Sequence, residues 1–115
     1  MPTSSKIIVN PSLLKPNASG FNPIVVSGIQ PSGTLHLGNY FGAIRQHVEL
    51  HAAVQSYFFI VNYHALTTLN DAKALRDYSV DVALDYLALG FDPSKSHLFL
   101  QSDVPQVTEL SWIFY

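Results

Sequence analysis

Short apolar runs and longer amphipathic stretches alternate three times along the chain, and this alternation constrains the fold more than any other feature. The short runs are rich in β-branched and aromatic residues, which is typical of strands, and the longer stretches have helical periodicity. The predicted strands are Ile24–Ser27, Tyr57–Asn62 and His97–Gln101, and the predicted helices are Leu37–Ala53, Asp71–Leu89 and Val107–Tyr115. Strands that are apolar on both faces and joined by helices indicate a parallel sheet. The sequence therefore predicts an α/β fold in three layers, with helices on both faces of the sheet.

The predicted helix Asp71–Leu89 has a marked beginning and end. Asn70 can cap its first turn, and Gly90 can adopt the left-handed conformation that ends a helix. Between them, charged residues recur every four positions on one side and apolar residues on the other, which is typical of a helix that packs one face against a core.

Polar residues follow each of the three predicted strands. In open parallel sheets, ligands bind beyond the carboxyl ends of the strands, which meet at one edge. The residues that the sequence brings to this edge are Gly28 and Gln30 after the first strand, Asn62 and His64 after the second, and Gln101 and Asp103 after the third. Gln101 and Asp103 also suit the cap of the following helix.

The segment from Gln30 to Asn39 reads as a glycine-bearing loop that leads into the start of a helix. Backbone N–H groups in the first turn of a helix have no intrahelical partners, and the helix dipole favours an anion there. His36 and Asn39, three residues apart, can offer hydrogen-bond donors, and Gly38 leaves space for a ligand ring. The pattern predicts a nucleotide phosphate site, with an ordinary strand-to-helix turn as the alternative.

His47 and His51 have the i, i+4 spacing of a zinc-binding pair. A metalloprotease helix carries Glu directly after the first histidine, and Val48 stands there instead. We therefore interpret the two histidines as part of a solvated helix face, and no metal ligand is predicted.

Composition bounds the partners and the compartment. The net charge of −2 gives no broad basic surface for RNA, and the absence of cysteine fits a reducing compartment. No apolar run approaches the roughly 18 residues of a membrane helix, and the first 22 residues read as an extended or disordered leader without the pattern of a signal peptide. The cytoplasm is the expected location, with no membrane partner. Only 12% of the residues are charged and the apolar Ser111–Tyr115 run has no stop signal, so we expect an amino-terminal piece of a longer protein.

Three ordered segments resemble the class I aminoacyl-tRNA synthetases. His36-Leu37-Gly38-Asn39 resembles the His-Ile-Gly-His signature of that class, and residues 27–43 as a whole closely resemble the amino end of the tryptophanyl-tRNA synthetase family. Residues 59–67 and 91–105 resemble the same family in order and spacing. The resemblance covers residues 23–115 and implies the truncated amino-terminal half of a catalytic domain, a partial Rossmann-type domain of the HIGH nucleotide-binding superfamily.

The function implied by the resemblance is ATP-dependent activation of L-tryptophan to tryptophanyl-adenylate, followed by its transfer to tRNA(Trp). ATP would be the substrate with Mg²⁺ bound through it, and the longer enzyme would be a homodimer that recognises tRNA through regions absent from this chain. The Lys-Met-Ser-Lys-Ser type loop of the class does not occur in the sequence. We therefore expect the chain alone to be inactive.

The resemblance also assigns roles residue by residue. It implies that His36 stabilises charge at the α-phosphate together with Asn39, and it places Gly28 and His64 near the amino acid. The residues that it implies for ATP binding are Gln30, Pro31, Ser32, Gly38 and Asn39. For His64 the alternative is a histidine satisfied by local backbone, and Asn62 departs from the aspartate that many members carry.

Three alternatives stay open. An adenylyl-group transferase of the wider superfamily usually has histidine as its second motif residue, so Asn39 and the Gln30-Pro31-Ser32 run count against it. A non-catalytic chain is favoured by the missing second signature loop. Tyrosyl-tRNA synthetase is the nearest competitor within the class, and the Gln-Pro-Ser-Gly run disfavours it.

Overall fold

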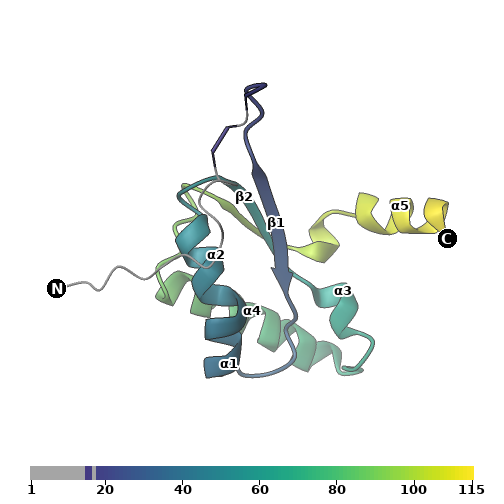
Figure 1. Cartoon of the computed structure of the whole chain (residues 1–115). Coiled ribbons are helices and arrows are strands. Elements are labelled where there is room, and N and C mark those ends of the chain that lie inside the picture. Colours follow the sequence, from purple (N-terminus) through teal and green to yellow (C-terminus); the bar gives the residue numbers. More distant parts are fainter. Residues whose placement is uncertain (1–14, 17) are drawn as a thin grey trace.

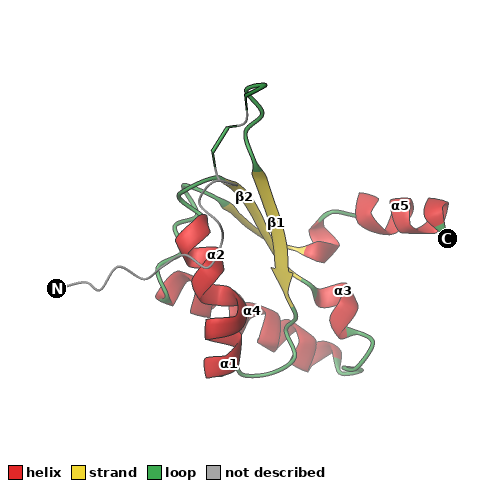
Figure 2. Ribbon diagram, viewed as in Figure 1, coloured by secondary structure: helices red, strands yellow, loops and turns green. Residues whose placement is uncertain are grey.

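Three parallel strands form a single sheet in the computed structural model, which describes residues 15, 16 and 18–115 (Figures 1 and 2). The strands are β1 (Ile24–Ile29), β2 (Gln55–Ile60) and β3 (His97–Leu100), in the order β1-β2-β3. The predicted α/β fold with a parallel sheet is confirmed. The leader predicted over residues 1–22 lies mostly outside the described residues.

Helices connect the strands and follow the last one. A continuous helix between β1 and β2 consists of α1 (Leu37–Asn39), the π-helical turn η2 (Tyr40–Ile44) and α2 (Arg45–Leu50). Between β2 and β3 lie α3 (Asn62–Ala65) and α4 (Ala72–Ala88), and after β3 come the 3₁₀ turn η3 (Gln101–Asp103) and α5 (Gln106–Phe114). The three predicted helices are confirmed, whereas the short α3 was not predicted. None of the α5 residues is buried, and α5 projects away from the sheet (Figure 1).

Both ends of α4 follow from the sequence. The Asp71 carboxylate accepts hydrogen bonds from the backbone N–H groups of Lys73 at 2.8 Å and Ala74 at 3.0 Å, so the cap lies one residue after the predicted Asn70. Gly90 ends the helix with a φ of +100°, the left-handed conformation predicted for it.

The hydrophobic core lies on one face of the sheet. It joins residues of β1 and β2 to residues of both long helices: Ile29, Ile44, Leu50, Phe58, Ile60, Val82, Tyr86 and Phe91. The long helices of the described residues therefore cover one face, where the sequence predicted helices on both. Successive crossovers of the same hand that step in the same direction along a sheet place their helices on the same side, and the β1-β2-β3 order does this.

The opposite face of the sheet, which we call the open face, carries exposed apolar side chains and stacked rings. Ile24 is 51% exposed and Val26 is 65% exposed. On the neighbouring strands, the rings of Tyr57 and His97 stack at 4.9 Å and those of Phe59 and Phe99 at 5.7 Å. The strands are thus apolar on both faces, as predicted, but no long helix of residues 18–115 covers this one.

His47 and His51 lie in the core, so the prediction of a solvated face is wrong. The His47 side chain stacks on Phe58 at 4.5 Å, and its ring nitrogens lie 2.6 Å from the Tyr86 hydroxyl and 3.0 Å from the Ser27 hydroxyl. His51 donates from Nδ1 to a backbone carbonyl one turn back and accepts at Nε2 from the backbone N–H of Asp92. Each ring nitrogen therefore has a protein partner.

Burial of His47 predicts acid sensitivity. Desolvation lowers its pKa from 6.5 to about 4, because the apolar surroundings disfavour the charged ring. Between pH 6.5 and 4 the unfolded chain binds the proton and the folded chain does not. The contribution of neutral His47 to the free energy of unfolding is therefore fully present above about pH 6.5 and is lost as the pH falls toward 4. At about 1.4 kcal/mol per pKa unit, we expect a loss of roughly 3 kcal/mol. Urea unfolding across this range measures it, and His47→Gln, which cannot titrate, should flatten the curve by that amount. If the free energy of unfolding varied with pH equally in the two proteins, the effect assigned to His47 would be wrong.

Candidate functional site

The loop that leaves β1 has a shape fixed by its own residues. Its backbone turns tightly at Gln30, whose carbonyl accepts from the N–H of Ser32 at 3.0 Å. Pro31 is fully buried, and Gly33 has a φ of +135°, which a side chain would strain. Gln30 and Pro31 therefore shape the loop, while Ser32 is exposed on it.

His36 and Asn39 cap the start of the helix that follows this loop. His36 Nδ1 accepts from the backbone N–H of Gly38 at 3.1 Å, and Asn39 Oδ1 accepts from the backbone N–H of His36 at 3.0 Å. This is the reciprocal geometry of a capping box. Because Nδ1 accepts, the neutral His36 ring carries its hydrogen on Nε2. The two side chains thus each keep one donor outside the box, His36 Nε2–H and the Asn39 amide NH₂.

Gly38 lies tightly against the His36 ring. A Cβ at Gly38 would lie 2.9 Å from His36 Cε1, closer than real Cβ atoms come, and 3.0 Å from His36 Nδ1, so the exposed ring would have to shift. The sequence predicted that Gly38 leaves space for a ligand ring, and in the structure the His36 ring lies beside that space. By contrast, a Cβ at Gly42 would meet nothing within 4 Å.

The π-helical turn η2 directly follows the capping box. The backbone N–H of Arg45 donates to the carbonyl of Tyr40, five residues earlier, which is the π-helical pattern. Such turns are frequent at functional sites. The sequence carried no periodic signal for it.

Gly28, predicted near the amino acid, is tightly packed. A Cβ there would lie 2.7 Å from Val61 Cγ2 and 2.9 Å from the Phe59 carbonyl oxygen. The absence of a side chain at Gly28 therefore first of all allows β1 and β2 to approach closely.

His64 lies exposed on α3, at the carboxyl end of β2. Asn62, the first residue of α3, bonds twice to Ser102 of η3, and Gln30 Nε2 lies 3.4 Å from the Thr68 hydroxyl after α3. The segments after all three strands thus meet at one edge of the sheet, as predicted. Among the described residues, no hydrogen bond joins the His36–Asn39 box to His64.

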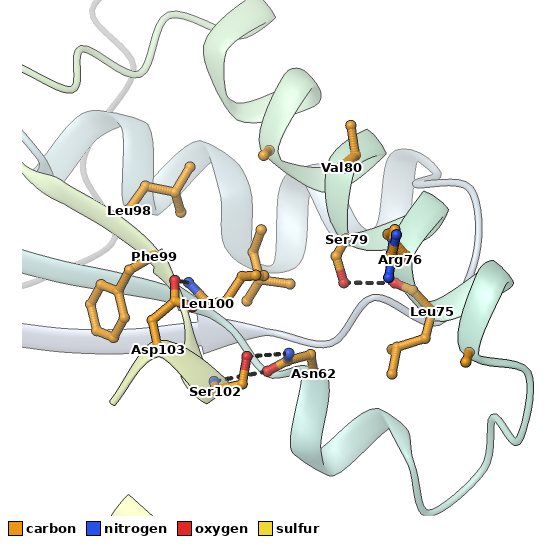
Figure 3. Close-up of a pocket in the computed structure, with 13 residues that line it drawn as sticks. Asn62, Leu75, Arg76, Ser79, Val80, Leu98, Phe99, Leu100, Ser102 and Asp103 are labelled. Atoms are coloured by element: carbon orange, nitrogen blue, oxygen red, sulfur yellow. Dashed lines mark hydrogen bonds between the residues drawn. The ribbon is translucent and has the colours of Figure 1, made fainter. Parts of the chain in front are cut away.

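A cavity of about 580 Å³ lies between α4 and β3 (Figure 3). Its wall includes Asn62, Ser102 and Asp103 from the strand-end edge, and the α4 residues Arg76 and Ser79, which sequence reasoning missed. None of the residues predicted for ATP binding lines it. Within the part of the chain that the structure describes, no helix is long and apolar enough to cross a membrane, and no cluster of three or more His, Asp or Glu side chains is placed to hold a metal ion.

Two relatives and one solved structure that are similar to this chain are all tryptophan–tRNA ligases. Tryptophan–tRNA ligase of Fusobacterium nucleatum is 54% identical over 88 residues, 76% of this chain and 27% of the relative, and that of Rhodopirellula baltica is 55% identical over 89 residues, 77% and 28%. The crystal structure of tryptophanyl-tRNA synthetase from Campylobacter jejuni complexed with ADP and tryptophan matches with a TM-score of 0.73 and 50% identity. The match covers 79% of this chain and 28% of the Campylobacter jejuni chain. The chain thus spans a little over a quarter of the length of these proteins.

A family model described as tRNA synthetases class I (W and Y) matches residues 20–115, which is most of the chain. The matched range contains β1, the capping box and all three strand ends. The chain therefore belongs to the class I tRNA synthetases of the W and Y family.

Proposed function

We propose that this chain supplies the nucleotide-binding part of a tryptophan–tRNA ligase. The observation that carries the proposal is the His36–Asn39 capping box at the strand-end edge of a parallel sheet, in a chain about half identical to tryptophan–tRNA ligases. Helix starts at this edge are suited to binding phosphates. The structural neighbour from Campylobacter jejuni was crystallised with ADP and tryptophan, which supports a nucleotide and an amino acid as substrates.

The proposed reaction has two steps. A carboxylate oxygen of tryptophan attacks the α-phosphorus of ATP, the bond from that phosphorus to the bridging oxygen breaks, and pyrophosphate leaves. The tryptophanyl-adenylate then transfers its acyl group to a ribose hydroxyl at the end of tRNA(Trp), and AMP leaves. Positioning and electrostatic stabilisation of the phosphate charge are sufficient for this chemistry, and no covalent enzyme intermediate is required.

The residues of this chain would act before and during the first step. His36 Nε2–H and the Asn39 amide are the donors left outside the capping box, and we assign both to the α-phosphate as its charge grows. Ser32 and Gln30 of the preceding loop, together with Gly38, would line the nucleotide, and buried Pro31 would hold the loop in shape beside it. His64 and Gly28 are assigned to the side of the amino acid.

The proposed partners follow from the same reaction. Mg²⁺ would bind through the ATP phosphates, and tRNA(Trp) would bind through other parts of the protein. We also propose a homodimer and a location in the cytoplasm, where ribosomes consume aminoacyl-tRNA. Tyrosine is the competing amino acid because the family includes both enzymes.

A chimera tests the proposal. Residues 20–115 of this chain would replace the equivalent segment of the Campylobacter jejuni synthetase, to which they are about 50% identical. We expect the chimera to exchange pyrophosphate into ATP when tryptophan is present and not with tyrosine. Exchange driven by tyrosine, or none with either amino acid from a folded chimera, would contradict the proposal.

The 115-residue chain by itself is expected to give no exchange above a blank. It spans only about 27–28% of its relatives and contains no Lys-Met-Ser-Lys-Ser type loop to hold the pyrophosphate. The same exchange assay, run with equal concentrations of chain and chimera, checks this. Tryptophan-dependent exchange by the chain would show that the downstream loop is dispensable.

A further inference from the structure

Asn62 and Ser102 form a two-bond side-chain clamp between the ends of β2 and β3 (Figure 3). Asn62 Nδ2 donates to Ser102 Oγ at 2.8 Å, and the backbone N–H of Ser102 donates to Asn62 Oδ1 at 3.1 Å. Both ends of the Asn62 amide are therefore used on one residue, 40 positions along the chain. Both bonds are partly buried, which limits competition from water.

This clamp is the side-chain anchor at the beginning of α3, beside the backbone hydrogen bond from the Val61 N–H to the Ile29 carbonyl at 2.8 Å. Val61, the residue before α3, makes no side-chain cap, and a helix of four residues has little stability of its own. At the other end, Ala65 is fully buried, and the Gln30–Thr68 contact is long at 3.4 Å. Asn62 therefore helps to fix how the start of α3 sits on the sheet edge, and His64 is two residues away.

We propose that Asn62 and Ser102 are positioning residues that hold α3, and with it His64, in place to bind the amino-acid substrate. This inference rests on the proposed function, because it takes His64 as a tryptophan-binding residue. The clamp also accounts for the amide at position 62. Aspartate, which the resemblance leads one to expect there, can accept both from the Ser102 N–H and from its hydroxyl, so either residue closes the same pair of bonds.

The kinetic test uses the chimera and separates the two substrates. Asn62→Ala is expected to raise the KM for tryptophan about tenfold, because it removes both bonds of the clamp, and to leave the KM for ATP and kcat within about threefold. Asn62→Asp should restore the tryptophan KM to within about twofold. Asn70→Ala, at an exposed asparagine between α3 and α4, is the matched control and should change neither KM. An unchanged tryptophan KM in Asn62→Ala, or an equal rise for both substrates, would overturn the inference.

Three further measurements separate the clamp from the proposed function. Asn62→Ala in a His64→Ala background should raise the tryptophan KM no further, since the clamp acts through His64; a full additional tenfold rise would overturn the inference. A His64→Ala chimera with unchanged tryptophan KM would contradict the role proposed for His64. Hydrogen exchange on the 115-residue chain tests the clamp alone. The amides of Ala65 and Leu66 should exchange about tenfold faster in Asn62→Ala than in Asn70→Ala, and equal rates would overturn the clamp itself.

Discussion

Replacing His36 with alanine in the chimera is expected to slow adenylate formation by roughly a hundredfold to a thousandfold. The expectation rests on the donor that His36 keeps outside the capping box, its Nε2–H, which can meet phosphate charge that grows toward the transition state. Loss of one such preorganised donor costs about 3–4 kcal/mol. Single-turnover adenylate formation across ATP concentrations measures the effect, because it separates nucleotide binding from the chemical step. The apparent affinity for tryptophan should hardly change.

The capping role of His36 requires its own control. Alanine also removes the cap, which costs on the order of 1 kcal/mol of stability. His36→Asn keeps a capping oxygen, and its amide NH₂ stops short of the position of the ring Nε2, so it should recover the thermal stability of the chimera while the reaction stays slow. If His36→Ala kept the maximal rate and only raised the ATP requirement, His36 would be a ground-state contact and its proposed role would be wrong.

Gly38→Ala is expected to slow the same step by about a hundredfold, although Gly38 donates nothing through a side chain. Its Cβ would lie 2.9 Å from the His36 ring, so the ring must shift within the capping box and its donor moves with it. Gly42→Ala is the matched control on the same helix, because a Cβ there meets nothing within 4 Å. We expect Gly42→Ala to leave the rate unchanged and to be neutral or slightly stabilising.

The double variant shows through which group Gly38 acts. If it acts through His36, His36→Ala/Gly38→Ala should be no slower than His36→Ala alone. If Gly38 instead makes room for the nucleotide, its substitution should raise the ATP requirement in either background. That second result would support the prediction made from the sequence, in which Gly38 leaves space for a ring of the ligand.

Periodicity and turn residues were sufficient to predict the strands, the parallel sheet and α4. Gly90 shows why, since the left-handed conformation at a helix end depends on a single local residue. The short α3 escaped prediction because four residues do not make a period. The sequence predicted helices on both faces of the sheet, whereas the long helices cover one. Apolar residues on both faces of β1 indicate that both faces are covered, but they do not tell which segment covers each face.

The polar residues were harder to place than the apolar ones. His47 and His51 share a helix face with buried Ile44, but their burial depends on Ser27, Tyr86 and Asp92, which come from other parts of the chain. His36 and Asn39 were correctly singled out as a pair at a helix start. Their mutual capping could not be foreseen, because the same nitrogen and oxygen atoms suit a ligand equally well. The roles assigned to them toward ATP stay predictions.

The β1-β2-β3 order lets the sheet assemble in the order of synthesis. Ile24 pairs with Gln55, 31 residues later, and Tyr57 pairs with His97, 40 residues later, so each strand finds its partner in the segment made just before it. Contacts of short sequence separation form faster than distant ones, and chains fold from the amino end as they leave the ribosome. We therefore expect β1 and β2 to pair, with α2 between them in the chain, before β3 has left the ribosome. Val26 is 65% exposed even in the completed sheet, so its side of the young sheet stays exposed to solvent throughout that interval.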